Sequence, residues 1–283
     1  MRINSNVMAI SALNMYKKNV SLMQKSMERL SSGLRINSAA DDPSGLAISE
    51  KMRAQIRGLR QASENAEDAI NFLSTAEGAL QQTTDILQRM RELTIKAQNT
   101  GVLSDSDKTA IEVEMTQLRD ELDRIAYSTT FNTKNLLDGS FTDDNPAIFQ
   151  IGASSSSYDK LEVTIGDMSS KGLSMDGTSQ FSIDLDTPEA MEQTLKNIDY
   201  ALDKTTSERA KMGAVQNRLE YTIENLKTTE ENLTAAESRI RDVDMAEEIL
   251  NYTKYSMLAQ VSLTLMAQAN KQQQMVLQLL QGL

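Results

Sequence analysis

Hydrophobic residues in the first 34 positions recur at alternating steps of four and three residues. The stripe runs through Ala9, Leu13, Tyr16, Val20, Met23, Met27 and Leu30. This heptad spacing places all of these side chains on one face of an α-helix. The opposite face is polar, so we expect this helix to need a partner helix that covers its apolar stripe.

A longer heptad pattern occupies residues 43–99 and predicts a single helix. The pattern runs through Met52, Leu59, Ala66, Leu73, Leu80 and Leu87, and it is widened by Ile56, Ile70, Met90 and Leu93. At a rise of 1.5 Å per residue such a helix would be about 85 Å long. Gly58 and Gly78 lie inside it, and we expect each of them to weaken the helix locally.

A polar break separates these two predicted helices. Ser31, Ser32 and Gly33 are residues that can end a helix, since glycine adopts a positive φ without steric cost. Asp42 and Pro43 suit the start of the next helix, with Asp42 as its N-cap and Pro43 at its first position. The break therefore predicts a fixed elbow between two helices.

Residues 99–104 predict a short turn that reverses the chain direction, with Ser104 or Asp105 capping the next helix. The next helix has its own apolar seam, formed by Ile111, Met115, Leu118, Leu122 and Ile125. Two helices joined by so short a turn form an antiparallel hairpin. If the hairpin is centred near residues 101–102, Glu114 lies beside Arg89.

The character of the chain changes in residues 128–188, where Ser, Thr, Asp, Asn and Gly dominate. Alternating patterns in residues 147–151, 161–165 and 181–186 predict two or three short strands with loops. We expect this region to form the outward tip of the helical part, and its serines at 154–157 to form a flexible loop.

Helical periodicity returns from Glu189. A seam runs through Leu195, Ile198, Leu202, Met212, Leu219, Ile223, Leu226 and Leu233, and it is interrupted by Thr205, Arg209, Gln216 and Glu230. After a break near residues 242–244, the last helix presents Leu258, Val261, Leu265, Met275 and Leu279 on its apolar face. The second half thus mirrors the first, which predicts that the first helix pairs with the last and the second with the second-last.

The predicted fold class is mainly α: a long antiparallel helical rod or bundle with coiled-coil terminal helices and a small β-hairpin region at the tip. We expect two core helices at the ends of the chain, two halves of a helical rod, and a short β region between those halves. The core helices occupy residues 1–42, with the following linker, and 242–283. The two halves of the rod occupy residues 43–128 and 189–241, and the short β region occupies residues 129–188.

Composition narrows the possible functions. The chain of 283 residues has no His and no Cys, which removes the commonest general base, the commonest metal ligand and all thiolate chemistry. The net charge is −11, yet residues 1–34 carry +4 and residues 249–283 carry +2, so the body carries −17. Basic residues are few and have no interleaved aromatics, and no stretch is long and apolar enough to span a membrane. We therefore expect no cofactor, no metal, no nucleic acid and no membrane contact.

Several stretches of sequence resemble bacterial flagellins. They are MRINSNVMAISALN, LSSGLRINSAADDPSGLAISEKMRAQIRGL, QRMREL, FNTKNLLDG, RAKMGAVQNRLEYTIENL, ENLTAAESRIRDVDMAEE and MAQANKQQQMVLQLL. They cover both ends of the chain and most of its helical part. Only residues 140–188 match poorly, because the chain has little of the large surface domain that many flagellins insert there. The resemblance is therefore to a short form of flagellin.

This resemblance implies a structural role. Flagellins are exported unfolded through a type III channel without signal cleavage, and they polymerise below a cap into the extracellular filament that propels the cell. Their terminal helices are disordered in the monomer and pair on assembly. Expected partners are further copies of the chain, the flagellar cap and hook-associated proteins, and an export chaperone at the C-terminal helix.

The resemblance also assigns candidate site residues. The expected self-assembly core consists of Leu13, Val20, Met27, Leu30, Leu258, Val261, Leu265 and Leu279. In flagellins a host toll-like receptor grips the segment that matches QRMREL, which here supplies Arg89 and Leu93 one helical turn apart, with Glu114 as a third candidate. On stability grounds alone, the Arg89–Glu114 pair would be only an exposed ion pair between helices.

Three other functions are compatible with parts of the pattern. A hook–filament junction protein shares the helical design, and a cytoplasmic coiled-coil scaffold would explain the heptads but not the acid-poor ends. An enzyme would need catalytic acids such as Asp41 and Asp42, or Asp143 and Asp144. Without His, Cys or a phosphate-binding loop, these acids are interpreted as helix caps and solvated turns, and no catalytic residue is expected.

Overall fold

The computed structural model describes residues 6–99, 101, 103–175, 181 and 183–281, with side chains described as far as residue 275. The helices are α1 (Val7–Ser32), α2 (Pro43–Ala97), α3 (Asp105–Ser128), α4 (Pro188–Arg241) and α5 (Met245–Gln281). The strands are β1 (Thr130–Phe131), β2 (Lys134–Asn135), β3 (Ala147–Gln150) and β4 (Lys160–Val163), and a short 3₁₀ turn covers Ser157–Asp159. No helix among these residues combines the length and the apolarity needed to cross a bilayer. The mainly α prediction is confirmed.

The chain divides into two compact units. The first consists of Met1–Ile56 and Glu231–Leu283, and the second of Arg57–Glu230. Helices α2 and α4 each contribute to both units. Among the described side chains, the largest fully buried ones lie in the second unit; they are Phe181, Leu73, Leu80, Leu87, Met90, Met115, Leu122, Leu136, Leu137, Ile165, Met168 and Leu173. It therefore contains the main hydrophobic core.

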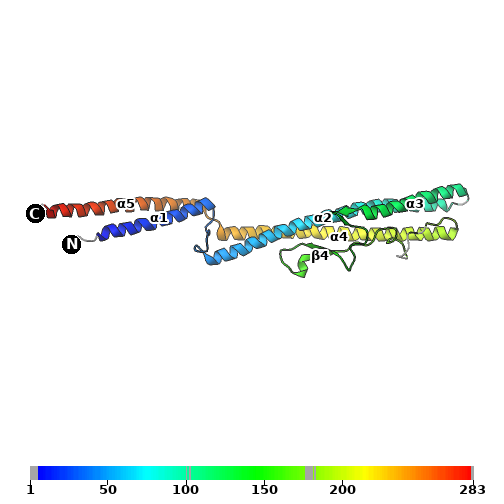
Figure 1. Ribbon diagram of the computed structural model, residues 1–283, viewed down its shortest axis with the longest axis horizontal. Coiled ribbons are helices and arrows are strands. Elements are labelled where there is room, and N and C mark those ends of the chain that lie inside the picture. Colours follow the sequence, from blue (N-terminus) through cyan, green and yellow to red (C-terminus); the bar gives the residue numbers. More distant parts are fainter. Residues whose placement is uncertain (1–5, 100, 102, 176–180, 182, 282–283) are drawn as a thin grey trace. The chain divides into compact units, whose positions relative to one another are not determined.

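The predicted heptad seam of α2 forms one wall of this core. Ala66, Leu73, Leu80 and Leu87 are completely buried, and alanines between them let neighbouring helices approach closely. On α3, Ile111, Met115 and Leu122 are buried and Leu118 is half-buried against the same cluster. Figure 1 shows α2, α3 and α4 side by side in this unit.

Polar residues that interrupt the seam of α4 find partners on α2 within the second unit. Thr205 is the exception: it is buried, and its hydroxyl donates to the Ala201 carbonyl of α4 itself at 2.8 Å. The cross-helix pairs are Arg209 with Glu77 at 3.5 Å, Gln216 with Ser74 at 3.3 Å, and Glu230 with Arg60 at 2.7 Å. These pairs fix α2 and α4 as antiparallel neighbours, as the mirrored pattern predicted.

The turn between α2 and α3 closes as the sequence predicted. Ser104 is the N-cap of α3, and it forms a capping box with Asp107, whose carboxylate accepts from the Ser104 backbone at 3.0 Å. The reciprocal bond, from the Asp107 amide to the Ser104 hydroxyl, is 3.4 Å long. Two otherwise unpaired N–H groups are thereby satisfied at the start of the helix.

The β segments form two small antiparallel sheets. Strands β1 and β2 pair Phe131 with Lys134, and β3 and β4 pair Ala147 with Val163. The β1–β2 hairpin was not predicted, because two-residue strands leave no alternation to detect. The third predicted strand does not form in the described part of residues 181–186, where Phe181 and Leu185 are buried core residues in irregular backbone.

The position of this region differs from the predicted tip. The chain reverses between the end of α2 and the start of α3, whereas the β segments lie along the flanks of the helices (Figure 1). Asn65 of α2 donates to the Gln150 carbonyl at 3.0 Å, and Lys204 of α4 donates to the Gly172 carbonyl at 2.6 Å. Because Leu161, Val163 and other apolar residues of the segment enter the main core, it is part of the helical unit rather than an appendage.

The first unit is built around α1 and α5, which lie side by side as predicted for the first and last helices (Figure 1). Helix α1 ends at Gly33, whose φ of 72° is the left-handed conformation expected for a helix C-cap. Helix α2 begins at Pro43, and the Asp42 carboxylate caps it by accepting from the Gly45 amide at 3.0 Å. Both predicted ends of the elbow are confirmed.

Candidate functional site

Small and polar residues line the contact between α1 and α5. The buried positions are Ala12 and Ser26 on α1 and Glu248, Ala259 and Ser262 on α5. Asn19 spans the two helices by donating to the Ser262 hydroxyl at 3.3 Å. Small side chains at the buried positions let the two helices approach closely, whereas larger residues of the contact such as Tyr255 and Met266 are only half-buried. Within the described residues, the pair therefore buries little apolar surface.

The large apolar residues of α5 lie on a different face. Leu258, Val261 and Leu265 are 40%, 51% and 50% exposed. The residues of α5 that face α1 instead follow a separate heptad register through Tyr252, Tyr255, Ala259, Ser262, Met266 and Ala269. The apolar stripe found in the sequence is thus not the stripe that covers α1. Leu279 lies beyond the last side chain that the structure describes.

On α1 the predicted stripe is only partly covered. Leu13, Val20 and Leu30 are half-buried, whereas Met27 remains 49% exposed. Further along α1, Met8 and Met15 are also exposed, and with Leu265 and Gln268 of α5 they border a hollow of about 420 Å³. The pair of helices therefore presents a broad apolar surface that no described residue of this unit covers.

A second cluster, the linker clamp, joins the two breaks of the chain. The backbone amide of Arg35 donates to the Arg241 carbonyl at 2.6 Å, and the Val243 amide donates to the Gly33 carbonyl at 3.1 Å. The Arg35 guanidinium adds a bond to the Ile240 carbonyl at 2.6 Å. These bonds cross-link the two linkers, so that each one holds the other.

Charged side chains complete the linker clamp. Arg241, which is 8% exposed, donates to the Glu50 carboxylate at 2.6 Å, and this bond lowers the pKa of Glu50. Arg29 of α1 lies 3.8 Å from Glu248 of α5. Sequence reasoning found the two breaks but not the residues that connect them, because contacts across some 200 positions leave no local pattern.

The paired acids of the elbow act as structural groups. The Asp41 carboxylate accepts from the Ser38 amide at 3.1 Å, and the Asp42 carboxylate accepts from the Gly45 amide at 3.0 Å. These hydrogen bonds lower the pKa of both carboxyl groups. Among the described residues no three acidic groups gather closely enough to hold a metal ion.

Arg89 and Glu114 form the predicted contact between α2 and α3. The Arg89 guanidinium donates twice to one oxygen of Glu114, at 3.1 and 2.9 Å, and Glu92 lies 3.4 Å away on the same helix. The bond to Glu114 raises the pKa of Arg89. Both side chains remain about half exposed, so their outer atoms are accessible.

Leu93 does not share this exposed surface, contrary to the expectation that it lies on a common face with Arg89. Its residual exposure is 2%, and it packs in the main core together with Met90 and Ala97. Helix α2 is covered by α3 on one side and α4 on another, which widens its buried arc to include Leu93. One helical turn of separation was therefore not enough to place both residues at the surface.

Comparison with known proteins identifies the family to which this architecture belongs. A family model described as the bacterial flagellin N-terminal helical region matches residues 3–142, and the bacterial flagellin C-terminal helical region matches residues 195–280. The flagellin of Bacillus subtilis (strain 168) is 49% identical over 305 residues, covering 99% of this chain and 100% of that protein. The chain belongs to the bacterial flagellin family.

Other relatives agree with this assignment. The flagellar filament 33 kDa core protein of Treponema phagedenis is 46% identical, with 99% of this chain and 100% of that protein covered. A solved structure of a putative flagellar hook-associated protein from Vibrio parahaemolyticus superposes with a TM-score of 0.60 over 71% of this chain and 100% of that chain. Its sequence identity of 15% shows a shared fold alone.

The family matches also place the candidate sites within this flagellin. Helix α1, helix α5 up to residue 280, the linker clamp and the Arg89–Glu114 pair fall inside the two matched regions. The interval between them, residues 143–194, holds β3, β4 and the start of α4. This is a short form of flagellin, without a large domain inserted between its two matched regions.

Proposed function

We propose that this flagellin is a subunit of the bacterial flagellar filament and that the exposed apolar faces of α1 and α5 are its self-assembly surface. The exposure of Leu258, Val261 and Leu265 is the observation that carries the proposal. Monomeric proteins rarely leave a contiguous apolar surface uncovered, and such a surface marks an interaction site. The assembly core consists of these residues with Leu13, Val20, Met27, Leu30 and Leu279.

A polymer suits this surface for a geometric reason. The apolar surface of α1 and α5 is broad, and its parts differ in their residues, so one copy can offer unlike patches to different neighbouring copies. Contacts between unlike patches are head-to-tail, and they generate open helical assemblies when the rotation between copies does not close a ring. Complete burial of each leucine or valine contributes about 1.5–3 kcal/mol, and this gain repeats for every subunit added.

Seeded polymerisation tests the proposal. Purified wild-type chain should elongate short filament seeds, whereas Leu265→Ser should raise the critical concentration at least about tenfold, because one buried leucine side chain is worth more than 1.4 kcal/mol. Gln260→Ser is the matched control, since Gln260 is an exposed polar residue of the same helix. Equal elongation by both variants would argue against α5 as the assembly surface.

The remaining partners follow from family membership and are part of the proposal. The chain is exported through a type III channel without a cleaved signal, and it polymerises outside the cell below the flagellar cap, next to hook-associated proteins. An export chaperone covers the C-terminal helix before export. The exposed leucines of α5 support this role, because they would otherwise promote aggregation before export.

We also propose that a host toll-like receptor recognises the surface around Arg89 and Glu114. Their half-exposed, oppositely charged side chains support a polar contact, and Leu93 takes no direct part because it is buried. In a receptor-reporter assay with monomer, Arg89→Asp should lower signalling. The double variant Arg89→Glu with Glu114→Arg restores the ion pair between the helices but changes the surface offered to the receptor, so it should also signal less. Full signalling by this double variant would show that the receptor does not bind at this surface.

A hook-associated role is the remaining alternative, and no specific observation favours it. The resemblance to the hook-associated protein is one of fold alone, whereas the relatives that match along the full chain are named as flagellins and filament core proteins.

A further inference from the structure

Four of the five phenylalanines of the chain gather in one place in the second unit. Phe72 of α2 makes edge-to-face contacts with Phe131, Phe141 and Phe149, with ring centroids 5.8, 5.6 and 5.4 Å apart. Phe72 is buried, but the other three rings are only half-buried. In a chain with 4% aromatic residues and no tryptophan, such a concentration of partly exposed rings is unusual.

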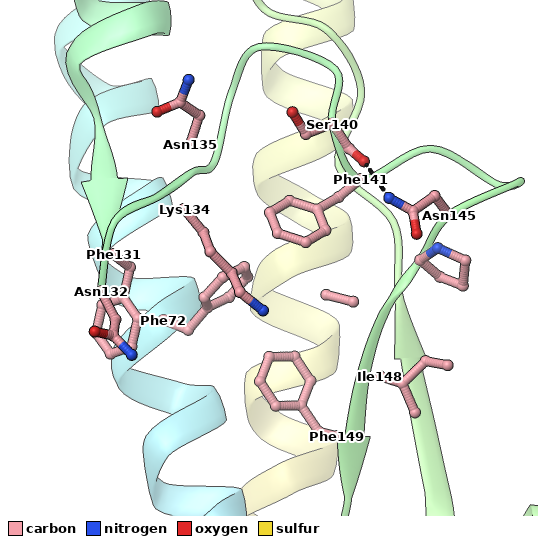
Figure 2. A pocket seen from close by; sticks show the side chains of 12 residues that line it. Phe72, Phe131, Asn132, Lys134, Asn135, Ser140, Phe141, Asn145, Ile148 and Phe149 are labelled. Atoms are coloured by element: carbon pink, nitrogen blue, oxygen red, sulfur yellow. Dashed lines mark hydrogen bonds between the residues drawn. The ribbon is translucent and has the colours of Figure 1, made fainter.

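These rings line a pocket of about 600 Å³, shown in Figure 2. Its walls come from α2, the β1–β2 hairpin, the loop from Ser140 to Pro146, and strand β3. The Asn145 amide donates to the Ser140 carbonyl at 3.0 Å and closes this loop at the border of the pocket, as Figure 2 shows. This volume, with mostly apolar walls and few polar groups, is typical of small-molecule sites.

Lys134 is the one charged residue among those that line the pocket. It lies on β2 opposite Phe131, and none of the ion pairs formed by described residues involves it. In Figure 2 its side chain extends from β2 toward the space between Phe141 and Phe149. An unpaired cation beside aromatic rings favours a ligand that has a flat aromatic body and one negatively charged group.

The turn that positions Lys134 is strained. Asn132 and Thr133 have φ values of 48° and 68°, the left-handed conformation that a hairpin of this tight type requires at both central positions. Asparagine tolerates it, but a β-branched threonine does so rarely. Backbone strain of this kind concentrates at ligand sites, where the surroundings hold it in place.

We propose that this pocket binds a small aromatic molecule with one acidic group, of the aryl carboxylate or aryl sulfonate class. The rings of Phe131, Phe141 and Phe149 contact the aromatic body of the ligand. The Lys134 ammonium pairs with its acidic group at the edge of the pocket. The inference does not depend on polymerisation, since all of its residues belong to one chain.

A pair of matched dyes tests the proposal. 1-Anilinonaphthalene-8-sulfonate and N-phenyl-1-naphthylamine share one aromatic skeleton, and only the first carries a negative charge. Fluorescence titration of the full-length monomer should show saturable binding of both. Lys134→Gln should weaken binding of the sulfonate about fivefold, the effect of an exposed charge pair, and leave the neutral dye unchanged. Phe149→Leu should weaken both.

Two control variants separate binding in this pocket from binding elsewhere on the chain. Lys160→Gln removes an exposed lysine of β4 that does not line the pocket, and it should change neither affinity. Leu258→Ser alters the apolar surface of α5, and it should also leave both titrations unchanged. Equal effects of Lys134→Gln and Lys160→Gln on the sulfonate would overturn the proposal. Loss of dye binding in Leu258→Ser would overturn it as well, by placing the dye on the terminal helices.

Discussion

The Arg241 guanidinium donates to the Glu50 carboxylate at 2.6 Å, which joins the last turn of α4 to the second turn of α2. Arg241 is almost fully buried, and its Nε has no partner within the described residues. The same residue supplies the carbonyl that accepts from the Arg35 amide. One side chain and one carbonyl of Arg241 thus hold both linkers of the chain in a single arrangement.

Removing this guanidinium should loosen the linker clamp. In Arg241→Met the apolar stem remains but the bond to Glu50 is lost, so we expect faster protease cleavage within residues 33–42 and 242–244 and little change in helix content. Arg53→Met is the matched control, because Arg53 also lies near Glu50, at 3.4 Å, but is half exposed. Equal cleavage rates in the two variants, measured by mass spectrometry of the fragments, would contradict a special role for Arg241.

The clamp should also weaken in acid. The hydrogen bond from Arg241 lowers the pKa of Glu50 below the ordinary value of a glutamate carboxyl group. A carboxyl group with a lowered pKa stabilises the folded state above its unfolded pKa, and this contribution disappears as the pH falls through the folded value. At pH 7, Glu50→Gln should therefore have a lower melting temperature than the wild type, and this difference in melting temperature should disappear below about pH 4. A difference that is constant with pH would refute this linkage.

Two glycines of α2 should respond in opposite ways to alanine. Gly78 has no atom near the position of an added Cβ, so Gly78→Ala should raise the free energy of unfolding by about 0.5–1 kcal/mol through helix propensity. At Gly58 the added Cβ would lie 2.9 Å from the Cβ of Ala153, so Gly58→Ala should gain nothing or be destabilising. Urea denaturation of both variants gives the comparison, and equal stabilisation would show that Ala153 moves aside freely.

Local patterns predicted the helices, both helix breaks and the Arg89–Glu114 pair. Gly33, Asp42 and Pro43 act through their own backbone geometry, so their roles can be read from neighbouring residues. The Arg89–Glu114 contact follows from the centre of one short turn. In an antiparallel helical hairpin, residues at equal distances before and after the turn lie beside each other. These features depend on separations of at most 25 residues.

Features that depend on how many neighbours a helix has were not predictable in the same way. Leu93 is buried because α2 is covered on two sides, and a single stripe does not reveal a second neighbour. On α5 the buried residues that face α1 include the small Ala259 and Ser262, so the most apolar stripe of the sequence indicated a different face of the helix. The aromatic pocket joins positions from 72 to 149, and no sequence period connects them.

The β segment should divide into a structural part and a dispensable part. Leu161 is 3% exposed and belongs to the main core, so Leu161→Ala should lower the free energy of unfolding by about 2–4 kcal/mol. Tyr158 is 91% exposed, and Tyr158→Ala should change it by less than about 0.5 kcal/mol. Deletion of residues 154–180 as a block should therefore destabilise the second unit, whereas replacing the serines at 154–157 should not. Similar losses for Leu161→Ala and Tyr158→Ala would contradict this division.

The terminal helices should open before any other part of the monomer. Their mutual contact buries small side chains such as Ala12, Ser26, Ala259 and Ser262, whereas all of the largest fully buried residues lie in the second unit. Local opening free energies follow the apolar surface that an element buries. Hydrogen exchange of dilute monomer should therefore be fastest in α1 and α5 and slowest in α2 near Leu80, and limited proteolysis should leave a core of about residues 40–240.

On assembly, burial of Leu258 and Leu265 should slow exchange in α5 by at least about tenfold. Equal protection of α5 in monomer and filament would mean that its apolar face is not covered by neighbouring subunits.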